Sequence, residues 1–302
     1  MSILQAIIIG IVQGLTEFIP ISSTAHLIFA SRLLNLYGDA PAALRAEQTT
    51  ATIAVIQLGT LAAVLIYFAP DILSITRAFV ADHFNLVRGR RETRAADGSV
   101  VPRRATLSDD ARLGWLLVLG SIPIAVVGLL FKEQIEGTFT KNLWIIASMM
   151  IGIALLLALA EKVGMRERGM KDLSLRDALA VGGAQVLALI PGASRSGSTM
   201  MGGLFAGQTR ETAARFSFLL SIPAIGASGL LELKEAVEKL PAGSALPLIV
   251  ATVVSGVVGY LSIWFLLRFL RTHSTGVFIG YRLAVGVALL ALLALGKISP
   301  LA

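Results

Sequence analysis

The chain has 302 residues, of which 55% are hydrophobic and only 15% charged, and its mean hydropathy is +0.79. A soluble domain carries about 25% charged residues, so this composition indicates a polytopic membrane protein. Cysteine is absent, which excludes disulfides, a thiolate nucleophile and cysteine-ligated zinc. The net charge of +7 is explained by cytoplasmic loops, where membrane proteins collect Lys and Arg. We therefore expect membrane lipids, and no nucleic acid, as partners.

Six runs with few or no charges are long enough to cross a bilayer, which takes about 20 mostly apolar residues. The expected spans are 48–70, 113–131, 142–160, 212–231, 246–267 and 275–296. The apolar N-terminus lacks a basic segment, so we interpret it as mature structure rather than a cleaved signal. The whole chain, residues 1–302, is expected to form a single integral membrane domain.

Two further apolar regions, about 3–35 and 178–208, are interrupted by polar residues. The first contains Glu17, Pro20 and a Ser-Ser-Thr run, and the second contains PGASRSGST, which begins at Pro191. Irregular backbone at membrane depth is tolerated only where protein or a cavity surrounds it. Each region therefore predicts a re-entrant helical hairpin, in which two short helices enter and leave the membrane on the same side.

The distribution of basic residues predicts how the chain is oriented. Arginine and lysine are concentrated in the loops 71–112 and 161–177, which the positive-inside rule places in the cytoplasm. The first hairpin then opens to the outside and the second to the cytoplasm. Similar stretches recur in the two halves, QGLTEFIPISS with QVLALIPGAS and SIPIAVVGLL with SIPAIGASGLL. The expected fold is thus all-α, with six transmembrane helices and two oppositely oriented re-entrant hairpins forming an inverted repeat, whose site lies at the repeat interface.

The first interruption concentrates polar side chains that could carry chemistry. Gln13 and Glu17 lie four residues apart and share a helix face. Ser22 stands where it can cap the next helix, and Ser23 and His26 follow within the first turn or so. Because carboxylate and amide oxygens suit hard cations, Gln13 and Glu17 are candidate ligands of a divalent metal such as Mg²⁺.

The second interruption places Arg195 at the start of a predicted helix that Ser194 or Ser196 can cap. Free N–H groups at a helix start, together with an arginine fork, form an anion site that suits phosphate. With a serine or a water as nucleophile and His26 as acid or base, the set suits phosphoryl transfer. The alternative is a transporter or flippase for an anionic lipid or small anion, which would release no phosphate.

Simpler interpretations exist for each part of this set. Glu17 and Arg195 could pair only to join the hairpins, His26 could be an interior histidine with satisfied hydrogen bonds, and the small residues could serve helix packing. These interpretations explain the convergence less well, because ionisable groups inside a membrane usually mark a functional site.

The motifs QGLTEFIPISSTAH and PGASRSGST closely resemble the two signature motifs of the bacterial undecaprenyl-diphosphate phosphatases, also called bacitracin-resistance proteins. The resemblance runs nearly end to end. It implies an enzyme of the bacterial cytoplasmic membrane that hydrolyses undecaprenyl diphosphate, a polyprenyl lipid, and recycles the carrier for peptidoglycan synthesis, with Mg²⁺ or Ca²⁺ as cofactor. The acid-phosphatase-like lipid phosphatases fit less well, since they need a histidine shortly after Ser-Arg and here the next one after Arg195 is His273.

The resemblance also assigns roles to individual residues. It places the family's metal-binding pair on Gln13 and Glu17, its catalytic histidine on His26, and a proposed serine nucleophile on Ser22 or Ser23. Its essential arginine falls on Arg195, and the phosphate-binding residues around it are Ser194, Ser196 and Thr199. Gln13 stands where many members have Glu, so Glu17 should contribute more to metal binding.

Three other residues receive simpler interpretations. Arg282 could bind phosphate or snorkel to the cytoplasmic headgroups, and snorkelling is favoured because the last span begins only about a turn earlier. His83 and His273 fall in or near cytoplasmic loops and are expected to be solvated. The sequence leaves open whether a serine, His26 or water attacks, and it leaves open the oligomeric state, a homo-oligomer included.

Overall fold

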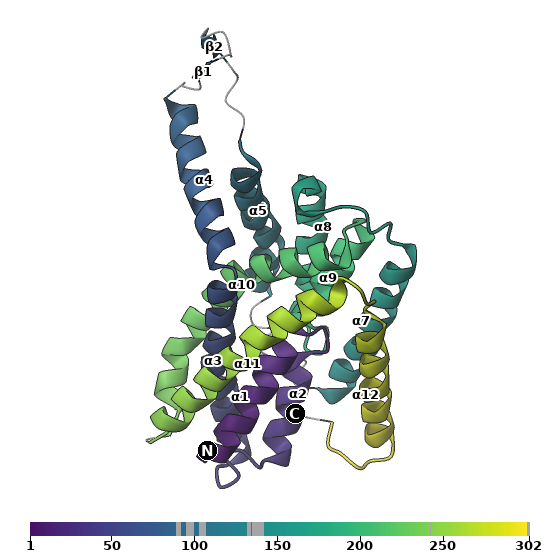
Figure 1. Cartoon of the computed structure of the whole chain (residues 1–302). Helices are drawn as coiled ribbons and strands as arrows, with labels where there is room; N and C mark the ends of the chain where they lie inside the picture. Colours follow the sequence, from purple (N-terminus) through teal and green to yellow (C-terminus); the bar gives the residue numbers. More distant parts are fainter. Residues whose placement is uncertain are drawn as a thin grey trace.

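The structure is a computed structural model that describes residues 1–88, 92–94, 100–102, 107–131, 134, 142–241 and 243–300. Within these ranges the chain is almost entirely helical. One short antiparallel pair of strands, β1 (Glu92–Arg94) and β2 (Val100–Pro102), stands apart from the helices at one end of the molecule (Figure 1). The predicted all-α class is confirmed.

The first half of the chain forms five helices. These are α1 (Ile3–Phe18), α2 (Ser23–Leu33), α3 (Ala42–Tyr67), α4 (Ala69–Val87) and α5 (Asp109–Leu130). Helix α3 passes into α4 at Phe68, which is fully buried, and Pro70 occupies the first turn of α4, where its missing N–H costs nothing. Helices α4 and α5 pack on each other, and α4 extends beyond the rest of the bundle (Figure 1).

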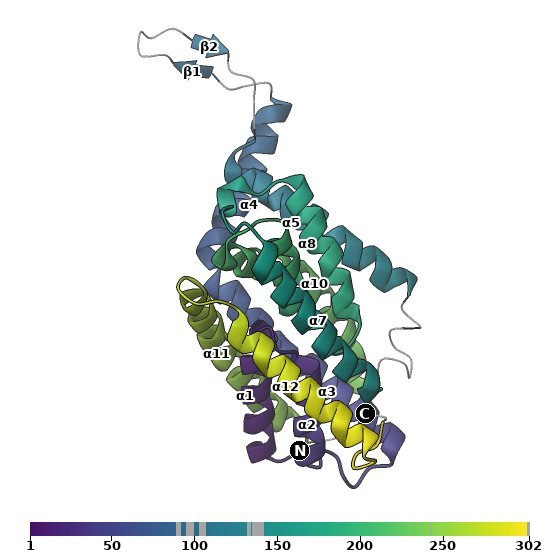
Figure 2. The same ribbon diagram turned by 90° about the vertical axis from the view of Figure 1, so that its right-hand side faces the viewer.

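The second half contains six α-helices and two short 3-10 turns. These are α7 (Leu143–Val163), η2 (Met170–Asp172), α8 (Leu175–Val186), η3 (Leu187–Leu189), α9 (Arg195–Phe205), α10 (Arg210–Lys239), α11 (Ala245–Leu270) and α12 (Gly276–Ala294). Helix α11 packs closely along α1 and α3, and α12 runs beside α7 (Figure 2). A side chain at Gly14 of α1 would lie 2.8 Å from backbone atoms of α11, so this contact requires glycine.

Five helices of the described part are long and apolar enough to cross a membrane. They are Glu47–Tyr67, Asp109–Leu130, Leu143–Val163, Ala245–Leu270 and Gly276–Ala294. Each coincides with one of the six predicted spans, which makes this chain a multi-pass membrane protein. The remaining predicted span, 212–231, falls within α10, a helix of 30 residues with Pro223 in its interior, and α10 is not one of the five.

Both predicted interruptions are present as breaks between short helices. Helix α1 ends before Pro20 and α2 begins at Ser23, while the second break lies between η3 and α9 and includes Pro191. Ser22 and Ser194 occupy equivalent places just before α2 and α9, and both have a left-handed backbone, with φ of 78° and 69°. The two breaks therefore share an unusual local geometry as well as a sequence pattern.

The predicted capping holds at one break and not at the other. Ser194 Oγ accepts a hydrogen bond from Gly197 N at 3.2 Å, which confirms it as the cap of α9. The prediction that Ser22 caps α2 is wrong, since its side chain forms no capping bond within the described ranges. Ser194 caps α9 from a similar left-handed backbone, so the conformation of Ser22 does not by itself explain the missing bond.

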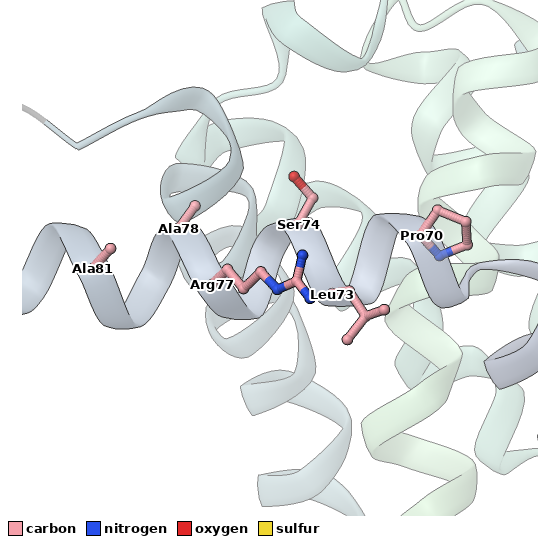
Figure 3. A pocket seen from close by; sticks show the side chains of 6 residues that line it. All are labelled: Pro70, Leu73, Ser74, Arg77, Ala78 and Ala81. Carbon is pink, nitrogen blue, oxygen red and sulfur yellow. The ribbon is translucent and has the colours of Figure 1, made fainter.

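A shallow hollow of about 560 Å³ lies along α4 and is shown in Figure 3. Its lining residues are Pro70, Leu73, Ser74, Arg77, Ala78 and Ala81, of which Arg77 alone is charged. Further along α4, His83 is half-buried, and its Nε2 accepts a hydrogen bond from Trp115 Nε1 at 2.9 Å. The prediction that His83 is solvated is therefore wrong, because α5 packs against α4 at this point. The polar residues from the motifs lie elsewhere, at the two breaks.

Candidate active site at the two helix breaks

Glu17 is the point at which the two breaks meet. It lies in the last turn of α1 and is only 7% exposed. Its Oε1 accepts a hydrogen bond from Arg195 Nη2 of α9 at 3.0 Å, and its Oε2 accepts one from Ser23 Oγ at 3.0 Å. The carboxylate thus joins the first turn of α2 and the first turn of α9, although Arg195 lies 178 residues further along the chain.

Gln13 lies one helical turn before Glu17, as the spacing predicts, and is buried. Its Nε2 donates to Glu17 Oε2 and to Thr60 Oγ1 of α3, both at 3.3 Å. The side-chain oxygen of Gln13 is buried and has no hydrogen-bond partner within the described ranges. Gln13 therefore presents a free acceptor next to the carboxylate.

The start of α9 lies against the break between α1 and α2. Ser196 Oγ donates to the carbonyl of Ile19 at 3.4 Å and lies 3.2 Å from Ser194 Oγ. Arg195 uses Nη2 to bind Glu17, whereas Nη1 is buried without a partner in the described part of the chain. The structure therefore brings together three of the four residues predicted to bind phosphate, and it leaves one arginine nitrogen available.

Thr199 is the predicted phosphate ligand that the structure places elsewhere. Its hydroxyl donates to the carbonyl of Arg195 at 2.8 Å and lies 2.5 Å from Ser217 Oγ of α10. Thr199 is fully buried and lies one helical turn beyond the start of α9. Its side chain therefore ties α9 to α10, and the packing of α10, which the motif alone does not reveal, determines that orientation.

His26 lies at the end of the first turn of α2 and is half-buried. Its Nδ1 is 2.7 Å from the carbonyl oxygen of Ser22, and its Nε2 is 2.7 Å from the hydroxyl of Tyr281 in α12. Because a carbonyl oxygen only accepts, Nδ1 must carry the proton of this bond. The hydroxyl of Ser22 itself is buried and has no partner in the described ranges.

Arg282 is the residue at the two breaks whose position the sequence predicted wrongly. It is fully buried, and its guanidinium donates to five backbone carbonyls at 2.9–3.3 Å. The acceptors are Pro20 in the first break, Gly192 and Ala193 in the second, and Met149 and Met150 of α7. The expected snorkelling is wrong because α12 packs on α7 with this face inward, and carbonyls freed by the breaks need donors. The sequence feature that could have indicated this buried position is an arginine within an otherwise apolar run.

The unpaired atoms test whether the site fits a metal and a phosphate. Buried polar atoms without partners cost free energy and are rare in folded proteins. The free acceptor on Gln13 beside Glu17 fits a divalent cation, and the free donor on Arg195 fits an anion. Within the described ranges, no three or more His, Cys, Asp or Glu side chains gather to hold a metal. A cation here would complete its shell with water and substrate oxygens, as Mg²⁺ commonly does.

These features define a multi-pass helical membrane protein with a buried site of carboxylate, arginine, imidazole and hydroxyl groups between two helix breaks. Residues 6–288 match the family described as bacitracin resistance protein BacA, and the chain belongs to this family.

Relatives named undecaprenyl-diphosphatase cover almost the whole chain. The protein from Syntrophobacter fumaroxidans is 51% identical over 290 residues, which are 96% of this chain and 97% of the relative. The protein from Chlorobaculum tepidum is 46% identical over 99% of this chain and its own full length. The one from Nocardia farcinica is 44% identical over 99% of this chain and 98% of the relative.

Proposed function

We propose that this protein hydrolyses undecaprenyl diphosphate to undecaprenyl phosphate and inorganic phosphate, the activity for which its relatives are named. This reaction recycles the lipid carrier for peptidoglycan synthesis. The observation that carries the proposal is the 3.0 Å contact between Arg195 and Glu17, which places an anion-binding group and a cation-binding group at one point. The names of the relatives favour hydrolysis over the transporter alternative.

The substrate phosphate would bind at the start of α9. Arg195 Nη1, the Ser194 and Ser196 hydroxyls and the first N–H groups of α9 are donors that suit phosphate oxygens. In phosphoryl transfer the charge spreads over the oxygens of the transferred group, and fixed donors of this kind stabilise that charge. The low exposure of the Arg195 side chain, 11%, strengthens the interaction because water screens it weakly.

The bond that breaks joins the terminal phosphorus to the bridging oxygen, and undecaprenyl phosphate leaves. The attacking oxygen comes from water, which gives inorganic phosphate directly, or from a serine, which forms a phosphoserine that water must then hydrolyse to release inorganic phosphate. Ser23 Oγ already donates to Glu17 Oε2, so this carboxylate can accept the hydroxyl proton. His26 binds the Ser22 carbonyl through Nδ1, which makes Nε2 the atom that can exchange a proton as general acid or base.

A divalent cation, Mg²⁺ or Ca²⁺, would be held by Gln13 Oε1 and Glu17. When bound it neutralises phosphate charge. The glutamine contributes an oxygen without a negative charge, so Glu17 sets most of the electrostatic affinity. Arg195 and the cation would then bind different oxygens of the same diphosphate.

The lengths of the short helices support the re-entrant hairpins. Helices α2, α8 and α9 have 11 or 12 residues, which corresponds to about 16–18 Å. A bilayer core is about 30 Å thick, so none of the three would cross it alone. The matching left-handed Ser22 and Ser194 support the inverted repeat, and α10 would be the sixth span. The site would open to the outer side of the bacterial cytoplasmic membrane, with the lipid tail in the bilayer.

The test is phosphate release from undecaprenyl diphosphate by purified protein in detergent, with Mg²⁺, with Ca²⁺ and with EDTA. We expect metal-dependent release that falls by about 100-fold or more in Glu17→Ala, His26→Ala and Arg195→Ala. Glu211→Ala is the matched control, because it removes a carboxylate from the surface pair with Arg271. It should retain the activity of the original protein.

Each arm of this experiment can contradict a separate part of the proposal. No release by the folded original protein rejects the hydrolase. Release that persists in EDTA rejects the metal, and undiminished release by Arg195→Ala rejects the phosphate site.

A further inference from the structure

His26 makes a contact that the reaction described above does not use. Its Nε2, the ring atom available for proton exchange, is 2.7 Å from the Tyr281 hydroxyl of α12. The two rings are stacked, with centroids 5.6 Å apart and an angle of 15° between their planes. Tyr281 lies 255 residues from His26 in the chain, so only the packing of α12 brings the pair together.

The position of Tyr281 is fixed by the residue that follows it. Arg282 is fully buried and bonded to carbonyls of both breaks and of α7, which sets the rotation of α12 about its axis. Tyr281 is 43% exposed and projects beside this fixed point. The hydrogen bonds of Arg282 that hold the two breaks therefore also place the Tyr281 hydroxyl next to His26.

We infer that Tyr281 is a positioning residue for His26, with its hydroxyl bound to Nε2 and its ring stacked on the imidazole. This inference rests on the proposed function. Two hydrogen bonds on opposite sides of the ring, from Nδ1 to the Ser22 carbonyl and from the phenol to Nε2, fix both the orientation of the ring and its tautomer. A ring held only by Nδ1 could rotate away from the phosphate.

The hydroxyl suits this role because it can both donate and accept. When His26 is neutral, the phenol donates its proton to the Nε2 lone pair. When Nε2 carries a proton, the phenol oxygen accepts the bond from it. Because Nε2 has one site for a proton or a hydrogen bond, the phenol holds the ring before the reaction and gives way when Nε2 exchanges a proton with the substrate or the nucleophile. It can form the bond again in either protonation state of the imidazole, and no proton of Nδ1 is involved.

The surroundings of His26 contain few other groups that could take over this role. Arg282 of α12 acts on the imidazole through its charge. Glu17 of α1 is linked to the start of α2 through Ser23. Within the described ranges neither forms a hydrogen bond to the ring, whereas Tyr281 does.

The test uses Tyr281→Phe, which keeps the stacked ring and removes the hydroxyl. Phosphate release is measured on the purified full chain, and the imidazole nitrogens are observed by NMR in protein labelled with ¹⁵N-histidine, without substrate. The chain has three histidines, so His26→Gln identifies the signals of His26. Tyr260→Phe is the matched control, since Tyr260 is 40% exposed on α11 and its ring lies at a tilted angle beside that of Tyr67.

We expect Tyr281→Phe to lower kcat about tenfold while KM changes by less than about twofold, because an orienting contact acts on the reacting group rather than on binding. The ¹⁵N chemical shift of His26 Nε2 should move toward the value of a nitrogen without a hydrogen bond. The ¹⁵N chemical shift of Nδ1 should stay at the value of a protonated nitrogen. Tyr260→Phe should change neither kcat nor the His26 signals.

Unchanged kcat in Tyr281→Phe, or a fall in kcat without a change in the Nε2 signal, would overturn the inference. The NMR measurement needs no substrate and so separates this inference from the proposed function. Absence of phosphate release by the original protein rejects the function, whereas an unmoved Nε2 signal rejects the role of Tyr281.

Discussion

At the residue scale, the two helix breaks depend on a single guanidinium. Arg282 binds backbone carbonyls from both breaks and from α7, and it is fully buried. Broken helices leave carbonyl groups without their usual partners, and in a membrane no bulk water can replace them. One arginine with five N–H groups satisfies several of them at once.

We expect Arg282→Lys to destabilise the protein strongly. Lysine keeps the charge but has one nitrogen, so it cannot reach carbonyls in three segments, and each buried group left unpaired costs about 1–3 kcal/mol. The apparent melting temperature in detergent should fall by at least about 5 °C. The matched control is Arg271→Lys, which changes an exposed ion pair with Glu211. This control should leave the apparent melting temperature nearly unchanged. An equal effect of both changes would contradict the role of Arg282.

Ser22 gives a second prediction, in which stability and activity change in opposite directions. Its φ of 78° favours glycine, and its buried hydroxyl has no partner in the described part of the chain. Ser22→Gly should therefore raise stability by about 1 kcal/mol while phosphate release falls, because the hydroxyl lies at the site. Asn35→Gly, at a left-handed position in the α2–α3 loop, should leave activity unchanged. A Ser22→Gly variant with full activity would exclude its hydroxyl from the reaction.

At the scale of elements, the second break is held against α7 by a close backbone approach. Gly192 has a φ of +92°, and a side chain there would lie 2.2 Å from the carbonyl oxygen of Ile146. The neighbouring carbonyl of Gly192 also accepts from Arg282. The path of the chain between η3 and α9 therefore depends on the absence of a side chain at this residue.

We expect Gly192→Ala to lower stability and activity together, because α7 and the start of α9 must separate to admit a methyl group. A loss of about 3 kcal/mol or more is expected from overpacking combined with an unfavourable backbone. Gly183→Ala is the matched control, because nothing lies within 4 Å of a side chain at this position in α8. It should raise stability by up to about 1 kcal/mol. Thermal unfolding and phosphate release measured on both variants test this prediction. A Gly192→Ala variant with unchanged stability and activity would contradict the described packing.

At the scale of the whole molecule, the sidedness of the chain follows from where its loops lie. Helix α4 extends at one end of the bundle, and both marked chain ends lie toward the other (Figure 1). Arg77 of α4, Arg88 at its end and Arg94 of β1 belong to the end with α4, so we expect by the positive-inside rule that this end faces the cytoplasm.

Cysteine labelling of intact cells tests this orientation, and the absence of native cysteine makes each label unambiguous. Asp39→Cys and Pro241→Cys, both at exposed loop positions, should react with a membrane-impermeant reagent. His273→Cys, at an exposed position between α11 and α12, should be protected until the cells are opened. The reverse pattern would invert the topology.

The sequence predicted most of the polar residues that the structure brings together at the two breaks, because each motif sets the local spacing of its own residues. The four-residue spacing of Gln13 and Glu17 and the cap of α9 at Ser194 are local features, and both are confirmed. The orientation of Thr199 toward Ser217 and the unbonded hydroxyl of Ser22 were not predictable. Each depends on a neighbouring helix or on a backbone conformation that the motif does not encode.

By itself, the sequence determined that this is a multi-pass helical protein, where five of its spans lie, and where two helices break. Those properties follow from composition, apolar length and proline, which act within one segment. Only the tertiary structure decided that Arg282 contacts both breaks, that Tyr281 contacts His26, and that Glu17 meets Arg195. Whether a side chain on a spanning helix faces lipid or protein depends on the rotation of that helix against its neighbours, and packing between distant segments sets that rotation.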